Sequence, residues 1–130
     1  MKKKISILLT IIMMFVIISG CGSKSNSTEN KKIKILFSIS DAKDSFRSIL
    51  AKSAESYAES ENIDLTIVDE ANSIEKQVAH MKEAVSGGYD VILCAPVDPN
   101  TALQLKKAAG GIPIVFINSA PNDELLEKNK

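Results

Sequence analysis

The sequence predicts an α/β fold, a doubly wound parallel sheet with the element order β-α-β-α-β-α-β. Short apolar runs alternate with amphipathic stretches from residue 33 onward, and the connections between them are short. One of these runs, residues 91–95, is apolar at every position, as is typical of a strand in the centre of a parallel sheet. Such alternation gives a parallel sheet with helices on both of its faces.

The first predicted strand covers residues 33–39, which are rich in β-branched side chains. A helix is then predicted from about residue 45 to residue 61, because apolar residues recur there at helical spacing. These apolar positions are Phe46, Ile49, Leu50, Ala54, Tyr57 and Ala58.

A second short strand is predicted at residues 65–68 and a second helix at about residues 73–86. We expect Asn72 to be the N-cap of this helix, with Glu75 at its third position, and the pair Gly87-Gly88 to end it. The apolar positions of the helix follow the spacing i, i+4, i+7 and i+11, at Ile74, Val78, Met81 and Val85.

The third strand is predicted at residues 91–95, where Cys94 is expected to be a small buried hydrophobe rather than a reactive thiol. Asp98 is predicted to cap the next helix, with Pro99 at its first position. This helix continues to about residue 109 and is expected to end at Gly110-Gly111.

The fourth strand is predicted at residues 112–117, and a short polar helix is expected to begin at residues 121–123. Open sheets of this kind bind ligands beyond the carboxyl ends of their strands. Those ends are predicted at residues 38–44, 69–71, 95–98 and 118–121.

The N-terminus has the pattern of an export signal. Basic residues 2–4 precede an apolar run at residues 5–18, which is too short for a bilayer span of about 20 residues. The tetrapeptide Ile18-Ser19-Gly20-Cys21 resembles the bacterial lipobox. This resemblance implies that residues 1–20 are cleaved off and that Cys21 becomes the lipidated first residue. The alternatives are an ordinary signal peptide, or a short anchor with a chance cysteine.

Cleavage before Cys21 leaves 110 residues, enough for one small domain. These residues carry 13 Lys+Arg and 16 Asp+Glu, a net charge of −3, which argues against a nucleic-acid partner. Residues 22–32 contain no apolar side chain and are expected to be a disordered tether. With Cys21 lipidated, Cys94 has no partner for an internal disulfide.

Several motifs resemble a known family. The runs at residues 88–102 and 112–118, together with Asp44-Ser45-Phe46, resemble the type 1 periplasmic binding proteins. They are most similar to the sugar-binding lipoproteins of ABC importers of the ribose and galactose type. The resemblance covers nearly all of residues 33–130. Cytoplasmic sugar-responsive repressors share this fold, but they begin with a DNA-binding helix-turn-helix, where this chain has a signal peptide.

The resemblance implies a sheet in which the second strand lies outside the first, with the third and fourth on the other side. Relatives have two lobes joined by a hinge, so residues 33–130 are expected to form an incomplete first lobe. The implied function is extracytoplasmic sugar binding for an ABC permease, by a truncated form anchored to the cell membrane. The alternative is a non-binding remnant, or a small membrane-tethered interaction module for a permease or a sensor kinase.

The resemblance also implies three ligand residues, each with a plainer alternative. Asp44 matches a carboxylate that binds sugar hydroxyls, or it caps its helix. Phe46 matches an aromatic ring that stacks on the sugar, or it packs on the sheet. Asn118 matches a polar ligand after the fourth strand, or it closes a turn. The next residue is Ser119 where several relatives carry Lys or Arg, which weakens assignment to a ribose-type or galactose-type pocket.

The sequence contains no pattern that indicates catalysis or a cofactor. There is no activated nucleophile with a base, no phosphate-binding glycine loop and no carboxylate pair at a defined spacing. His80, the one histidine, falls between the apolar positions of its helix and is expected to be solvated. A single histidine cannot build a metal site, so neither an enzyme nor a metal centre is expected.

Overall fold

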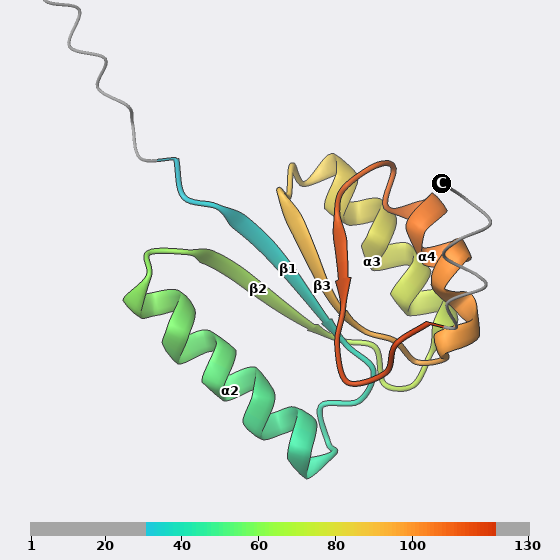
Figure 1. Ribbon diagram of the computed structural model, residues 1–130, viewed down its shortest axis with the longest axis horizontal. Helices are drawn as coiled ribbons and strands as arrows, with labels where there is room; N and C mark the ends of the chain where they lie inside the picture. Colours follow the sequence, from blue (N-terminus) through green and yellow to red (C-terminus); the bar gives the residue numbers. More distant parts are fainter. Residues whose placement is uncertain (1–30, 122–130) are drawn as a thin grey trace, which may run out of the picture. The chain divides into compact units, whose positions relative to one another are not determined.

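The computed structural model describes residues 31–121. They form a four-stranded parallel sheet in the order β2-β1-β3-β4 (Figure 1). The predicted α/β class and the strand order implied by the resemblance are both confirmed. The predicted signal, most of the tether and the polar helix expected from residue 121 lie outside the described residues. The strands are β1 (Lys34–Ile39), β2 (Asp64–Asp69), β3 (Val91–Ala95) and β4 (Ile114–Phe116).

Helices cover both faces of the sheet, α2 on one face and α3 with α4 on the other (Figure 1). Within the part of the chain that the structure describes, no helix has the length and apolar character needed to cross a bilayer. The last helix begins with a tight 3-10 turn, η2, before it becomes α-helical. The helical elements are α2 (Ser45–Ser60), α3 (Ile74–Ser86), η2 (Pro99–Thr101) and α4 (Ala102–Ala108).

The main core lies between the sheet and the pair α3 and α4. Alternate side chains of a strand point to opposite faces, so the even-numbered residues of β1 and β3 enter this core. Cys94 is one of them and is 0% exposed, as predicted, and burial raises the pKa of its thiol to about 12. The buried residues of this core are Leu36, Met81, Ala84, Ile92, Cys94, Leu105 and Ala109.

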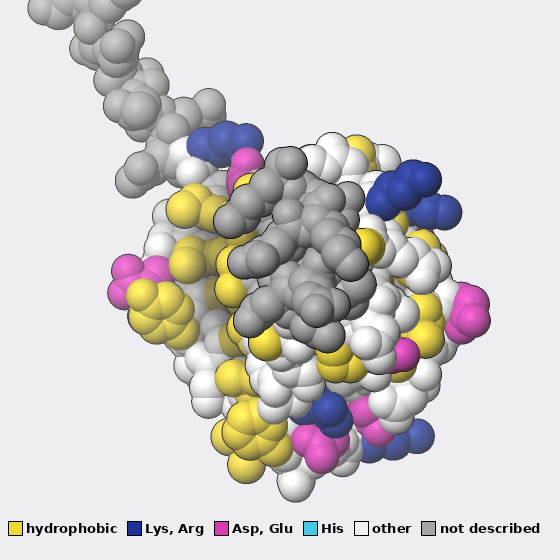
Figure 2. Space-filling model, turned by 45° about the vertical axis from the view of Figure 1, so that its right-hand side comes forward, with side chains coloured by type: hydrophobic (Ala, Val, Ile, Leu, Met, Phe, Trp, Pro, Cys, Tyr) yellow, Lys and Arg dark blue, Asp and Glu magenta, His cyan; other side chains and the backbone are white. Residues whose placement is uncertain are grey.

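The face covered by α2 is less complete. Phe37 and Ile39 of β1 are each 1% exposed there, and Ala58, at 5% exposed, is the one buried residue of α2. Three of the six apolar positions of the predicted helix, Phe46, Ile49 and Tyr57, are 58–65% exposed. The helix was therefore predicted correctly from its apolar spacing, although half of those positions face away from the core. Hydrophobic side chains are visible on this side of the molecule as yellow patches (Figure 2).

One predicted cap is wrong and another is confirmed. Ser73, not Asn72, is the N-cap of α3, and its Oγ accepts from the backbone N–H of Lys76 at 3.2 Å. Asn72 instead adopts a left-handed backbone with φ 58°, and its own N–H donates to the carbonyl of Ser40. Its amide is thus used to join two loops rather than to cap. Asp98 caps the following helix as predicted, since its Oδ1 accepts from the N–H of Asn100.

β4 is shorter than the predicted strand at residues 112–117. Pro113 and Ile117 still exchange single backbone hydrogen bonds with β3, one at each end of the strand. Among the described residues β4 pairs only with β3, so its other edge is open. Val115 points to the α2 side of the sheet and is 49% exposed.

Candidate functional site

The turn after β1 carries two of the three predicted ligand residues. Asp44 Oδ1 accepts from the backbone N–H of Arg47 at 2.9 Å, so this carboxylate does cap α2. The Arg47 guanidinium lies 3.9 Å from the same oxygen, and its Nε is buried without a partner among the described residues. Phe46 is 58% exposed, so it does not pack into the sheet. The turn therefore presents a carboxylate beside an exposed aromatic ring.

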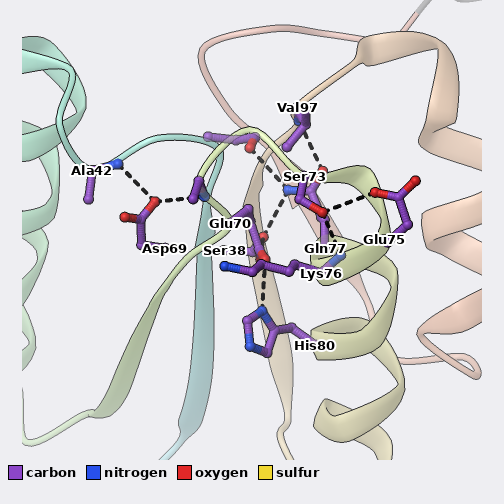
Figure 3. Close-up of polar contacts among 12 residues, drawn as sticks. Ser38, Ala42, Asp69, Glu70, Ser73, Glu75, Lys76, Gln77, His80 and Val97 are labelled. Carbon is purple, nitrogen blue, oxygen red and sulfur yellow. Dashed lines mark hydrogen bonds and ion pairs between the residues drawn. The ribbon is translucent and has the colours of Figure 1, made fainter.

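Asp69, at the end of β2, ties this turn to the next one. Its Oδ1 accepts from the backbone N–H groups of Ala42 and Ala71, each at 3.0 Å (Figure 3). These two hydrogen bonds stabilise the carboxylate, and they hold the pKa of Asp69 below its ordinary value. Asp41 and Asn72 join the same two loops through a side-chain hydrogen bond of 2.9 Å. Two loops at the carboxyl edge are thus fixed to each other.

Asn118, the third predicted ligand residue, follows β4 on the same edge of the sheet. Its backbone is left-handed, with φ 66°, and its side chain is exposed. The next N–H, that of Ser119, turns back to the carbonyl of Ile117 at 2.8 Å. Asn118 therefore does form part of a turn. Because β3 lies between β1 and β4, this turn and the Asp44 turn are separated by one strand along the edge.

A buried polar network lies just below this edge, between the sheet and α3 (Figure 3). Glu70 is 0% exposed, and Ser38 Oγ donates to its Oε1 at 2.5 Å. Its other oxygen lies 2.7 Å from His80 Nδ1. The expectation that His80 is solvated was wrong: its side chain is 27% exposed and turns toward the buried carboxylate.

Gln77 extends this network to the loop after β3. Its side chain is 0% exposed, and its Nε2 donates to Ser38 Oγ at 2.9 Å and to the carbonyl of Ala95 at 3.2 Å. Its Oε1 accepts from the backbone N–H of Val97 at 2.9 Å. The amide thus holds both sides of Pro96, at the point where β3 reaches the carboxyl edge.

Sequence reasoning missed this network, although one signal of it was present. Gln77 lies beside Val78, within the apolar spacing that runs from Ile74 to Met81, so a polar amide interrupts the buried stripe of the helix. A polar residue in that position needs buried partners. Which residues would supply them, however, depends on how α3 lies over β1, and no local pattern gives that.

The network is not arranged for nucleophilic catalysis. Its carboxylate lies between the serine and the histidine, so His80 does not contact the hydroxyl that it would have to deprotonate. Ser38 is also 0% exposed. Among residues 31–121, no group of three or more His, Cys, Asp and Glu side chains is placed to hold a metal ion. A surface hollow of about 570 Å³ runs along α4, beside Leu103, Lys106 and Gly110.

The chain is similar to known binding proteins. Residues 35–127 match the family model described as a periplasmic binding protein domain. A protein of Rhizobium meliloti, named as rhizopine-binding, is 33% identical over 81 residues, which are 60% of this chain and 26% of that protein.

Solved structures share the fold. One is a periplasmic solute-binding protein of an ABC transporter from Actinobacillus succinogenes with bound D-allose. Its TM-score is 0.67 at 21% identity, over 75% of this chain and 35% of that one. Another is the Caulobacter myo-inositol binding protein with myo-inositol, at a TM-score of 0.62 and 20% identity, over 69% of this chain and 31% of that one.

The chain thus spans about a quarter to a third of the length of these relatives. The named relatives are binding proteins rather than enzymes, and the match extends over most of the chain. The parallel sheet, its strand order and the polar loops at its carboxyl edge agree with that match. The chain belongs to the periplasmic binding protein domain family.

Proposed function

We propose that this chain is an extracytoplasmic solute-binding lipoprotein of a carbohydrate ABC importer, in a truncated form that contains part of the first lobe. Its ligand is a sugar or a similar polyol, and its partners are an ABC permease and the membrane that holds its lipid anchor. In this proposal the carboxyl edge of the sheet is the ligand-binding edge, and Asp44, Phe46 and Asn118 contact the ligand.

The observation that carries this proposal is the match of residues 35–127 to the periplasmic binding protein domain. Two buried polar atoms at the carboxyl edge of the sheet support it. Ser40 Oγ and Arg47 Nε are buried and have no hydrogen-bond partner within the described residues, and both flank the turn after β1. A buried polar atom without a partner costs about 1–3 kcal/mol. Hydroxyl groups of a polyol both donate and accept hydrogen bonds, so a polyol that enters the turn as the turn rearranges would satisfy both atoms.

The three ligand residues supply complementary chemistry. Asp44 uses Oδ1 as a cap, which leaves Oδ2 to accept from a ligand hydroxyl. The exposed ring of Phe46 offers an apolar face to the C–H surface of a sugar. The amide of Asn118 can donate and accept at once. Asp44 and Asn118 can bind a ligand and keep their structural roles. The cap uses Oδ1 of Asp44, and the turn uses the backbone of Asn118.

Sugar binding by this chain alone should be weak. A single lobe leaves a sugar half solvated, where its hydroxyl groups gain little over water, so we expect dissociation constants of about 1 mM or weaker, roughly −4 kcal/mol. Asn118→Gly keeps the left-handed turn, which glycine adopts freely, but removes the amide. It should weaken binding several-fold in an NMR titration with D-allose, ribose and myo-inositol.

The matched control for this titration is Asn62→Gly, because Asn62 is also left-handed, with φ 56°, but lies between α2 and β2. The control should bind like the parent. Micromolar binding of any monosaccharide would contradict the weak-affinity prediction. Equal affinities for the parent and Asn118→Gly would remove Asn118 from the site.

The lipid anchor can be tested directly. Cells that express the chain should incorporate radiolabelled palmitate into it, and Cys21→Ala should abolish the label, because the cysteine is the acceptor of the lipid. Cys94→Ala is the matched control and should be labelled like the parent. Equal labelling of Cys21→Ala and the parent would show that the N-terminus is not a lipoprotein signal.

A second candidate function is a small interaction module for a permease or a sensor kinase. The exposed apolar residues of α2, Phe46, Ile49 and Tyr57, favour it because exposed apolar patches mark interaction sites. The DNA downstream of Lys130 discriminates the two. A continuation that encodes a hinge and a second lobe supports the importer subunit, and unrelated sequence supports the module.

A further inference from the structure

The loop after β3 is held by one buried side chain. Gln77 binds the carbonyl of Ala95 and the N–H of Val97, the two backbone groups that flank Pro96. Proline has no N–H of its own, so it cannot contribute a backbone donor to this segment. The loop geometry therefore depends on which way the Gln77 amide points. Its oxygen must face Val97 and its NH₂ must face Ala95.

The direction of that amide is set by the residues behind it. Glu70, as a carboxylate, only accepts hydrogen bonds, so the single hydroxyl hydrogen of Ser38 is directed to its Oε1. Ser38 Oγ is then left with lone pairs, which accept from the NH₂ group of Gln77. An NH₂ group fixed there places the amide oxygen opposite Val97.

His80 completes the chain of contacts at its outer end. Its Nδ1 contacts Oε2, the second carboxylate oxygen of Glu70, and its ring is partly exposed at the surface of the molecule. Hydrogen bonds in a row polarise one another when they are buried. The contacts run from a partly exposed ring to the carboxyl edge of the sheet (Figure 3).

We infer that His80, Glu70 and Ser38 are positioning residues, which act through Gln77 to fix the backbone of the loop at residues 95–98. We call the row of hydrogen bonds from His80 through Glu70, Ser38 and Gln77 to this loop the relay. The role of the loop in ligand binding rests on the proposed function, whereas the relay itself does not. These side chains do more than satisfy one another, because the Glu70–Ser38 bond determines the direction of the Ser38–Gln77 bond, and that bond determines the orientation of the Gln77 amide.

The substitution Glu70→Gln tests the direction of the relay. It keeps the shape of the side chain, and with the amide oxygen held by the N–H of His80 Nδ1 it places an NH₂ group where it donates to Ser38 Oγ. The Ser38 hydrogen is then free to turn toward Gln77, whose amide flips to accept it. In the flipped amide the NH₂ group faces the N–H of Val97. Two donors cannot form a hydrogen bond, so the bond that holds Val97 is lost.

The experiment is backbone hydrogen exchange by NMR on the full chain in detergent micelles. The Val97 amide is compared with that of Ile92, which is hydrogen-bonded to Pro113 within the sheet. Glu70→Gln should raise the exchange rate of Val97 by about tenfold or more relative to Ile92, as expected for local opening of one loop. Glu59→Gln, an exposed change on α2, is the matched control and should leave the ratio unchanged.

Two results would overturn the inference. Equal acceleration of Val97 and Ile92 would mean that Glu70 contributes only to global stability, and an unchanged Val97 would mean that the relay does not reach the loop. If Glu70→Gln does not fold, the parent chain decides. A scalar coupling across the hydrogen bond from Val97 nitrogen to the Gln77 side-chain carbonyl is expected, and its absence would refute the relay. No sugar is used, so failure of the proposed function would not affect either readout.

Discussion

Replacing His80 by alanine should lower the free energy of unfolding by about 2–3 kcal/mol, because a buried carboxylate loses one of its hydrogen-bond partners. Glu70 is 0% exposed, and the vacated side of its carboxylate has no other partner among the described residues. Alanine is a better helix former than histidine, which offsets about 0.5 kcal/mol of this loss. Equilibrium urea unfolding of the two chains, side by side, measures the difference.

Two further variants show whether the loss acts through Glu70. Lys82→Ala, an exposed change on the same helix, should alter stability by less than about 0.5 kcal/mol. In the Glu70→Gln background, His80→Ala should cost about 1–2 kcal/mol less than in the parent, because the two residues are in contact. An equal cost in both backgrounds would mean that His80 contributes through packing alone.

The second large effect concerns the edge of β4 that has no partner strand among the described residues. Residues 33–130, made without the lipid, should be marginally stable and should associate through this strand. The segment from Ile112 to Ile117 carries no charge, and its one protecting residue is Pro113, near its start. A domain of this size also has little stability in reserve. Sizing chromatography and thermal melts measure both properties.

A lysine on the strand should prevent this association. Val115→Lys places a charge at a half-exposed position of β4, and the variant should elute as a monomer where the parent does not. Ile49→Lys is the matched control, because Ile49 is 65% exposed on α2 and lies away from the edge. Rescue by Ile49→Lys alone would assign association to the apolar side of α2. A parent that is a clean monomer and melts cooperatively above about 60 °C would contradict the prediction and favour the stand-alone module.

Most of the fold was predictable because local patterns carry it. The strand at residues 91–95 was confirmed at its predicted bounds. A short apolar run between turn residues is typical of a buried strand in a parallel sheet. Asp98 was confirmed as a cap because the signal, an aspartate before a proline, is entirely local. The burial of Cys94 followed from its place within that strand.

The errors all depend on contacts between distant residues. Asn72 and Ser73 are both good caps, and the choice between them was made by the carbonyl of Ser40, which takes the Asn72 N–H. His80 was expected to be solvated because the spacing along α3 says nothing of Glu70, which directly follows β2. The ligand roles of Asp44, Phe46 and Asn118 stay predictions, although the structure places these residues at one edge of the sheet.

The polar network under the edge also restricts how α3 can lie on the sheet. Apolar side chains tolerate shifted packing, because one hydrocarbon contact can replace another. The Gln77 amide cannot be replaced in that way: a shift of one helical turn, about 5.4 Å, would separate it from Ser38, Ala95 and Val97 together. Glu70 would lose His80 in the same movement. The network therefore specifies the register of α3 on the sheet. It disfavours misaligned compact states that hydrophobic packing alone would allow.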